Sequence, residues 1–326
     1  MRLDVRHTLR RLRASPGFAL VAILSLGLAI GANVIVTAVA RALLFEPLPV
    51  NRPAELAFFD WSRTIDDRVS NIGASNFRDP ADGLSYTSNV SAPAYRLIRD
   101  TTPAGAQVAA FALLPEIGVG TEGQPSTIVA GVLASGTYFR VVQPPLTLGR
   151  ALDDRDDRPD AEPAAVISHG LWLRAFAGAP DALGSTLLVN GRAVRIVGVT
   201  AAGFRGLAAT PTEITLPLSA QPWVAPAWTP ESGSLATSDL SHWLRVVARV
   251  PDAVSRPAWT SALTAALGQY VVEAHVAESV SAAAVHARLV SGARGVDTAY
   301  AGFARTRTET SISILAIATG VVLLLA

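Results

Sequence analysis

The sequence of 326 residues contains no cysteine and no lysine. Without cysteine the chain can form no disulfide and no thiolate nucleophile, and it cannot bind zinc or an iron–sulfur cluster through sulfur. Without lysine it has neither the phosphate-binding lysine of a Walker A motif nor a lysine that could form a Schiff base. The chain therefore cannot itself be an ATPase, and we predict no bound cofactor.

Charge is also scarce. Only 16% of the residues are charged, against roughly 25% in ordinary soluble domains, and half are hydrophobic. The 27 basic and 26 acidic residues nearly cancel, so the chain lacks the positive charge with which proteins bind nucleic acid. The composition predicts a membrane protein that does not bind nucleic acid.

A long apolar segment lies close to the N-terminus. No residue between Arg13 and Arg41 is ionisable. As a helix, residues 17–40 would extend about 36 Å, more than the ~30 Å hydrocarbon core of a bilayer. We predict a transmembrane helix over 17–45. Within it Asn33 is expected to form a hydrogen bond to another helix rather than to serve transport chemistry.

The flanks of this segment predict its orientation. Residues 1–16 are rich in arginine and the residues after the span are not, which predicts a cytoplasmic N-terminus and a periplasmic location for the region after the span. Residues 1–16 could form an amphipathic basic helix on anionic membrane lipid, with Val5, Leu9 and Leu12 on one face. The alternative is a plain basic flank with no helix.

Two further features concern the ends of the chain. A basic start, an apolar run and Ala38-Val39-Ala40 imitate a secretory signal peptide, but the run exceeds the ~7–15 residues usual for one, which favours a retained helix. Residues 311–326 are apolar and uncharged but reach only about 24 Å as a helix. We therefore predict that 309–326 is the truncated start of a second transmembrane helix.

The region 46–308 is predicted to be an extracytoplasmic α+β domain, a mixed α/β core of two subdomains. Asn190-Gly191 between β-branched runs is a strong hairpin signal. A long loop is expected over 220–239, which has three prolines and two tryptophans. The expected strands are 55–61, 107–120, 126–133, 164–168, 186–189, 193–199, 213–218, 242–250 and stretches near 276–290, and the expected helices are 94–99, 170–176 and 255–267.

Several ordered sequence blocks resemble one family. Ser15-Pro16-Gly17-Phe18, residues 27–33 (GLAIGAN) and residues 43–49 (LLFEPLP) accompany the first span. The outer region then has residues 136–139 (GTYF), 148–150 (LGR), Asp153-Asp154, 166–172 (VISHGLW), 188–192 (LVNGR), 197–199 (VGV) and 203–206 (GFRG). In this order the blocks resemble the MacB/FtsX-type ABC transporter permeases and their MacB-like periplasmic core domain, of which this chain would be an N-terminal fragment.

The resemblance implies a non-catalytic permease subunit in the bacterial inner membrane. A separate cytoplasmic ATPase would close on ATP, the helices would shift, and the periplasmic domain would move to export or release a substrate already outside. Implied partners are that ATPase, a second permease in a dimer or an internally paired permease, a periplasmic adaptor and an outer-membrane channel. The alternative function is a membrane-tethered periplasmic binding or signalling ectodomain that regulates envelope processes.

Candidate chemical sites are weak in this sequence. Residues 153–157 (DDRDD) lack the spacing of a calcium loop, so a solvated loop is expected. Ser168 and His169 lack the Gly-x-Ser-x-Gly elbow of a hydrolase, although a secreted hydrolase using Ser168 is a third alternative. We predict no catalytic, cofactor-binding or metal-binding residue. The histidines His7, His169, His242, His275 and His286 show no metal-ligand spacing and are expected at the surface or at helix caps.

The glycines and tryptophans are also expected to have structural roles and not functional ones. Gly198 and the pair Gly203 and Gly206 lack the Gly-x-Gly-x-x-Gly order, so bends of a hairpin explain them better than phosphate binding. Large aromatic side chains are commonly buried, and a core role is expected for five tryptophans. These are Trp172, Trp223, Trp228, Trp243 and Trp259.

Overall fold

The computed structural model describes residues 47–62, 69–73, 76–79, 82–208, 210–230, 233–274 and 284–295, with parts of the segment 16–34. The chain divides into two compact units, one of residues 1–46 with 301–326 and one of residues 47–300. In the first unit, residues 16–17, 20–21, 23–28, 30–31 and 34 are helical.

The predicted membrane segments fall largely outside the described residues. This holds for most of 1–16, for part of 17–45 including Asn33, and for all of 309–326. Among the residues that are described, no helix is both long enough and apolar enough to cross a bilayer.

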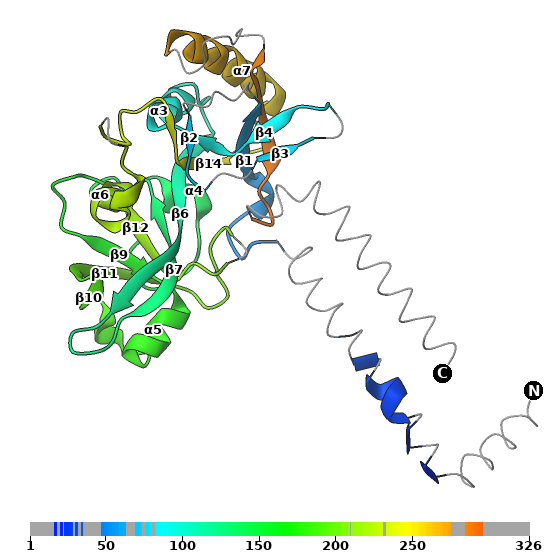
Figure 1. The fold of residues 1–326 in the computed structure, drawn as a ribbon, viewed down its shortest axis with the longest axis vertical. Helices are drawn as coiled ribbons and strands as arrows, with labels where there is room; N and C mark the ends of the chain where they lie inside the picture. Colours follow the sequence, from blue (N-terminus) through cyan, green and yellow to red (C-terminus); the bar gives the residue numbers. More distant parts are fainter. Residues whose placement is uncertain are drawn as a thin grey trace, which may run out of the picture. The chain divides into compact units, whose positions relative to one another are not determined.

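One sheet organises the second unit (Figure 1). Its central strand, β6 (Gln107–Gly120), is long enough to take part in two different arrangements. The first half of β6 pairs with β14 (Leu244–Arg249), and the second half pairs with β7 (Thr127–Ala134) and β10 (Thr186–Val189). The strand thereby joins a closed barrel to an open sheet.

The barrel is closed by the pairing of β10 with β6. The neighbours around it run β6, β7, β12, β9, β11, β10 and back to β6. The β10–β11 hairpin turns at Asn190-Gly191, both at positive φ, as the sequence predicts. Helix α5 (His169–Phe176) packs outside β11. The remaining strands are β12 (Ile214–Pro217), β9 (Ala164–Ile167), β11 (Arg192–Thr200) and β8 (Leu146–Gly149), which pairs with β11.

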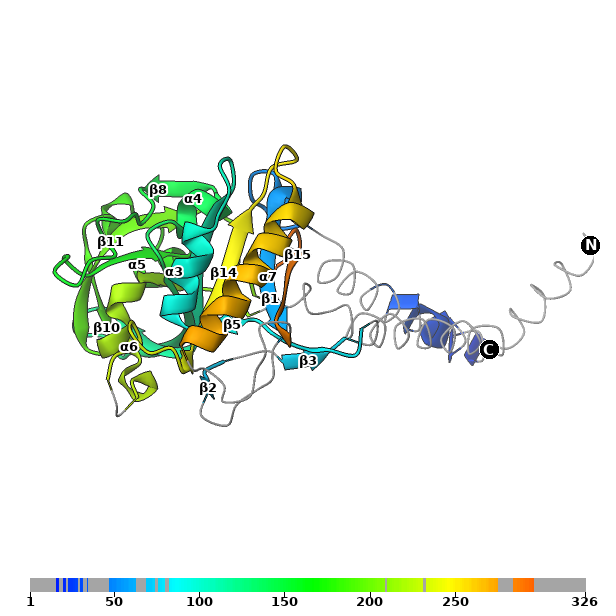
Figure 2. The same ribbon diagram turned by 90° about the horizontal axis from the view of Figure 1, so that it is seen from above.

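The open sheet continues from β6 through β14 to β1 (Leu56–Ser62). Strand β15 (His286–Ser291) pairs with β1 along most of its length. Helices α3 (Ala92–Asp100) and α7 (Arg256–Glu273) lie side by side over one face of this sheet (Figure 2). The short strands are β2 (Ser70–Asn71), β3 (Asn76–Arg78), β4 (Ser85–Thr87), β5 (Asn89–Val90) and β13 (Ser241–His242).

The two helices over the sheet begin at serine N-caps. Ser91 and Ser255 each accept a hydrogen bond from the backbone N–H three residues on, and a proline follows within the first turn. In α7 the buried side chains recur every four residues, from Trp259 through Leu263 and Leu267 to Val271. Each is at most 3% exposed, and burying it contributes up to about 1.5–3 kcal/mol.

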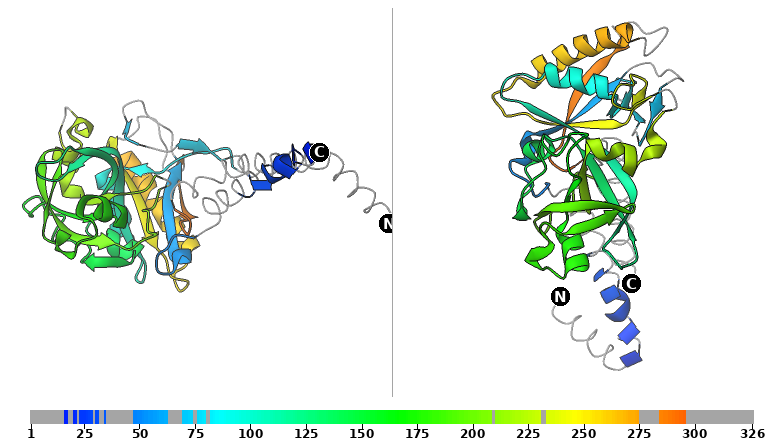
Figure 3. Two further views of the ribbon diagram at one scale, coloured as in Figure 1. Left: turned by 90° about the horizontal axis from the view of Figure 1, so that it is seen from below. Right: turned by 90° about the vertical axis from the view of Figure 1, so that its left-hand side faces the viewer.

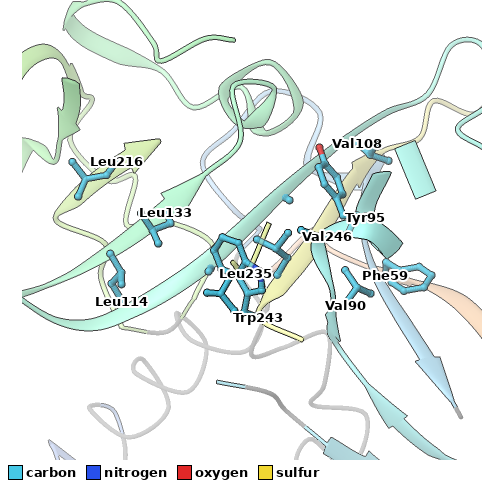
Figure 4. Close-up of a cluster of buried hydrophobic side chains, with 14 of the residues drawn as sticks. Phe59, Val90, Tyr95, Val108, Leu114, Leu133, Leu216, Leu235, Trp243 and Val246 are labelled. Carbon is cyan, nitrogen blue, oxygen red and sulfur yellow. The ribbon is translucent and has the colours of Figure 1, made fainter. Parts of the chain in front are cut away.

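A first hydrophobic core fills the space between the helices and the sheet and extends into the barrel (Figure 4). The alternation of β1 is clear here, since Ala57, Phe59 and Trp61 point into this core. Leu56 and Phe58 point to the opposite face, where a second core lies. Both faces of β1 are therefore buried. Figure 3 shows the barrel strands in green and the helix pair in cyan and gold.

The predicted elements agree closely with the observed ones. Strand β6 has the predicted bounds, and the predicted helix 255–267 is observed but continues to Glu273. The expected loop 220–239 contains only short helical turns among its described residues. Residues 275–283 lie outside the described residues. The sequence analysis missed α4 (Tyr138–Val142), α6 (Gln221–Val224), β8 and the short strands β2 to β5.

Gly198 stands inside β11 and not in a hairpin bend, so the bend explanation was wrong for this residue. It lies at an irregularity in the pairing of β11 with β9, where a Cβ atom would overlap the carbonyl oxygen of Arg150. Gly203 and Gly206 have φ of +94° and +87°, which favour glycine and fit the predicted bends. The close approach at Gly198 holds the chain after β8 against the barrel.

We expect Gly198→Ala to destabilise the domain by about 1–3 kcal/mol, because the added methyl group meets backbone that cannot rotate away. Thermal or urea unfolding measures this. Gly170→Ala in α5 is the matched control, since a Cβ there meets nothing closer than 3.4 Å, and it should leave stability unchanged or slightly raised. Equal stability for the two variants would contradict the packing argument.

Candidate functional site

The two chain segments that connect the domain to the predicted membrane spans meet at one place. The Leu48 N–H donates a hydrogen bond to the Ala293 carbonyl oxygen at 2.7 Å. Where β1 begins and β15 ends, the Gly292 N–H donates a hydrogen bond to the Leu56 carbonyl oxygen at 2.8 Å. We call the segments 47–55 and 291–295 together the junction. A displacement of one segment relative to the other would therefore break these backbone hydrogen bonds.

The second hydrophobic core lies beneath the junction, with Leu48 and Val50 packed against it. Gly295 adopts φ of +96°, and a Cβ there would contact the Leu207 carbonyl oxygen at 2.5 Å, so the second segment also lies against this core. The buried side chains come from β1, β6, β7, β9, β14, helix α4 and two loops. They are Leu56, Phe58, Ala109, Phe111, Val132, Ala134, Tyr138, Phe139, Val141, Val142, Leu152, Ala164, Val166, Phe204, Leu207 and Val247.

Arg249, at the end of β14, ties the junction to α4. It is 5% exposed. Its Nε donates to the Val141 carbonyl oxygen at 2.7 Å and its Nη2 to that of Val142 at 3.1 Å. Its Nη1 donates to the Arg52 carbonyl oxygen and to Glu55 Oε2, both at 3.2 Å. One guanidinium group therefore joins the end of a helix to the first segment of the junction.

Two residues at this place have left-handed backbone. Arg52 has φ of +44° and Gln143, the C-cap of α4, has φ of +55°. They are linked through Asn51, whose side chain donates to the Gln143 side-chain oxygen at 3.0 Å. Non-glycine residues in this region cost on the order of 1–3 kcal/mol each and gather where a structure is functionally constrained. The junction is thus locally strained and held by surrounding contacts.

The acidic run 153–157 lies beside the second core, and its predicted solvation was wrong for two of its residues. Asp156 is buried and accepts both Nη1 and Nη2 of Arg150, at 2.6 and 2.8 Å. It also accepts the Asp153 N–H at 2.9 Å. Asp154 is exposed, as expected. These contacts hold residues 150–157 in place, and we call this segment the strap.

Asp157 connects three segments. Its Oδ1 accepts the Ser219 N–H at 2.8 Å, and its Oδ2 accepts the Gly136 N–H at 3.3 Å. Gly136 and Ser219 come just after β7 and β12, which are parallel neighbours, so the carboxyl group spans their C-terminal ends. Burial of the carboxyl group raises the pKa of Asp157 to about 6, although the two N–H groups act in the opposite direction.

The other weighed residues have structural roles where they are described. Ser168 is the N-cap of α5, accepting the Leu171 N–H at 3.0 Å, and the ring of neighbouring His169 contacts Trp172. Nothing in this arrangement prepares Ser168 as a nucleophile. Among described residues, no group of three or more His, Asp or Glu side chains is placed to hold a metal ion.

His242 was expected at the surface or at a helix cap, and that prediction was wrong, because it lies in β13. It is fully buried and stacks on Trp61, with ring centroids 5.7 Å apart. His286 is exposed, as expected, whereas His7 and His275 lie outside the described residues. Of the tryptophans, Trp243 and Trp259 are buried, and the other three are partly buried against the first core, so their core role is confirmed.

Sequence reasoning missed Arg249. The available signal was its position at the end of a strand in which every residue is buried, because a buried arginine requires several acceptors. Its partners are mainly backbone carbonyl groups, which leave no trace in the side-chain pattern. A pair of charges could have been sought, but Glu55 lies 194 residues away.

We expect Arg249→Met to destabilise the chain by about 3–5 kcal/mol, because Glu55 and two helix-end carbonyl groups lose a buried partner. Arg249→Lys should recover only part of the loss, since a single ammonium group cannot reach four acceptors. Arg99→Met is the control, an exposed arginine paired with Asp100, and it should change stability by less than about 0.5 kcal/mol. Similar unfolding midpoints for all variants would show that the hydrogen bonds of Arg249 do not stabilise the junction and α4.

We also expect Asp157 to give stability a defined pH dependence. Its folded pKa of about 6 lies above its ordinary 3.8, so the folded state binds this proton more tightly. Its contribution is complete below pH 4 and is lost as the pH rises through 6. Asp157→Asn cannot titrate, so the wild type should lose about 1–2 kcal/mol relative to this variant between pH 4 and 7. Parallel unfolding profiles would show that Asp157 does not titrate there.

Comparison with known proteins connects this geometry to a family. The family model of the MacB-like periplasmic core domain matches residues 19–266. No curated protein matches the chain. Similar solved structures include a domain of a putative permease protein from Porphyromonas gingivalis, with TM-score 0.48, 18% identity and coverage of 74% of this chain and 91% of that one.

Two further solved structures are similar to this chain. The periplasmic region of MacB from Actinobacillus actinomycetemcomitans has TM-score 0.46 and 15% identity, covering 74% of this chain and 91% of that one. The extracellular domain of the noncanonic ABC-type transporter YknZ from Gram-positive bacteria has TM-score 0.45 and 13% identity, covering 71% and 98%. Because the family model spans more than half of its residues, the chain belongs to the family of the MacB-like periplasmic core domain.

Proposed function

We propose that this chain is part of the permease subunit of an ABC transporter of the MacB/FtsX type. It would sit in the bacterial inner membrane with its N-terminus in the cytoplasm and residues 47–300 in the periplasm. Its task would be to convert ATP-driven movement of membrane helices into movement of the periplasmic domain. The observation that carries the proposal is the hydrogen-bonded contact between the two connecting segments at Leu48 and Ala293.

The contacts of the junction fit such a coupling. A relative shift of the two segments by a few ångströms would break the Leu48–Ala293 hydrogen bond, which has a length of 2.7 Å. The same shift would pull on Arg52 and Glu55, and through Arg249 on the end of α4. Packed interfaces respond to small shifts by changing between discrete arrangements. The junction therefore has the connections required to pass movement into the second core.

The partners are inferred from the family and from the chain's own limits. The chain has no lysine for a Walker A motif, so ATP hydrolysis would belong to a separate cytoplasmic subunit. We propose that the permease works as a dimer or an internally paired unit, with an adaptor and an outer-membrane channel as further partners. Its substrate would be one that is already outside the cytoplasm and is exported or released from there.

Because these 326 residues contain no cysteine, introduced thiols can test the coupling. We would express the full-length coding sequence with its candidate ATPase subunit, and introduce Leu48→Cys together with Ala293→Cys. The ATPase is expected to co-purify with the chain. The rate of crosslinking between the two introduced thiols by a short bifunctional reagent should change several-fold between nucleotide-free and ATP-bound complexes, and crosslinking should inhibit ATP turnover.

The control pair is Leu188→Cys with Ala193→Cys, which lie directly opposite in the β10–β11 hairpin. Its crosslinking should not depend on nucleotide. If no ATPase co-purifies and the junction pair also ignores nucleotide, the transporter proposal fails. The tethered binding or signalling ectodomain then becomes the better explanation.

A further inference from the structure

A cleft on the outside of the barrel is lined by four arginines. It has a volume of about 550 Å³ and lies between the strap that comes after β8 and the middle of β11. This size falls within the range of about 300–1,000 Å³ typical of small-ligand sites. Its apolar floor includes Leu183 and Val197. The arginines are Arg150, Arg155, Arg158 and Arg195.

Arg150 is the fixed member of this group. Its two terminal nitrogens bind the buried carboxylate of Asp156 at 2.6 and 2.8 Å, and Nη1 also donates to the Ala151 carbonyl oxygen. Hydrogen bonding to Asp156 raises the pKa of Arg150. The side chain is nevertheless 49% exposed. A guanidinium group held in this way loses little conformational entropy when it contacts a ligand.

Arg195 is the most available member. Its only ion pair in the described part of the chain is a long one, from Nη1 to Glu162 at 3.4 Å, and the Glu162 side chain is 69% exposed. Its Nη2 lies beside Gly184, which has no side chain to fill the space. Nε and Nη2 make no hydrogen bond among the described residues. They can donate to a ligand without giving up a protein contact.

The internal ion pairs at this site are too weak to exclude an anion. Arg155 pairs with Asp153, and Arg158 pairs with Asp160, each two residues away, and both arginines are largely exposed. Ion pairs between exposed side chains contribute little to stability, because water and salt screen them. A phosphate group carries more charge than a carboxylate and offers several oxygens in a tetrahedral arrangement, so guanidinium groups on opposite walls can bind it together.

We propose that this cleft binds the phosphate group of an anionic ligand, with Arg195 and Arg158 as the exchangeable contacts and Arg150 as the fixed one. The ligand displaces Glu162 from Arg195 and places its non-phosphate part on Leu183. This binding site is separate from the junction and does not depend on the proposed transport role.

The test uses the full-length chain in a phosphate-free maltoside detergent. Inorganic phosphate is titrated by calorimetry at constant ionic strength, with chloride as the reference anion. Saturable binding is expected, and Arg195→Gln should weaken it by at least about tenfold, with Arg158→Gln acting in the same direction. Unchanged thermal unfolding of these exposed-site variants confirms that the fold is kept.

Arg192→Gln is the matched control, because Arg192 lies on the same strand but outside the cleft, over the ring of Trp223. It should bind phosphate as the wild type does. A short-chain phosphatidic acid then separates the sources: tighter binding than inorganic phosphate indicates a lipid head group, and equal binding indicates a soluble phosphate. Absence of saturable phosphate binding, or equal affinity in Arg195→Gln and the wild type, overturns the proposal.

Discussion

A helix of five residues cannot satisfy the carbonyl groups at its own end, and α4 is such a helix, buried in the second core. Water cannot reach those groups, so the protein must supply donors. Arg249 does so, and its remaining donors bind Arg52 and Glu55 of the junction. The same side chain that satisfies the buried carbonyl oxygens of α4 therefore also holds residues 52–55 against the end of β14. The second core and the junction depend on that one guanidinium group.

The long strand β6 sets the relation between the barrel and the open sheet. Its residues alternate between the two cores, with Ala110 and Ala112 facing the first and Ala109 and Phe111 facing the second. β14 pairs with the first residues of β6, and β7 and β10 pair with the residues further along, so this one strand connects the open sheet to the barrel.

Sequence reasoning succeeded where the signal is local and failed where it depends on distant partners. The β10–β11 hairpin is predicted by Asn190-Gly191, and α7 is predicted from residue 255, next to its observed start. Helix α4 and strand β8 are too short to show a period. The residues next to Asp157 in the sequence do not distinguish it from the other acidic residues of its run. Its partners Gly136 and Ser219 lie 21 and 62 residues away and approach it only in the folded chain. The candidate site was missed for the same reason, since Arg249 binds mainly backbone atoms.

The sequence blocks that carry the family resemblance acquire a physical meaning at these contacts. Gly136 faces the backbone of Asp154, Gly149 faces the Val197 carbonyl oxygen, and Gly198 faces that of Arg150, each at a distance that leaves no room for a side chain. Three of the blocks therefore mark places where the strap 150–157 or the end of β8 packs closely against β11 or the chain before α4. They specify close backbone packing around the second core and supply no set of reactive groups.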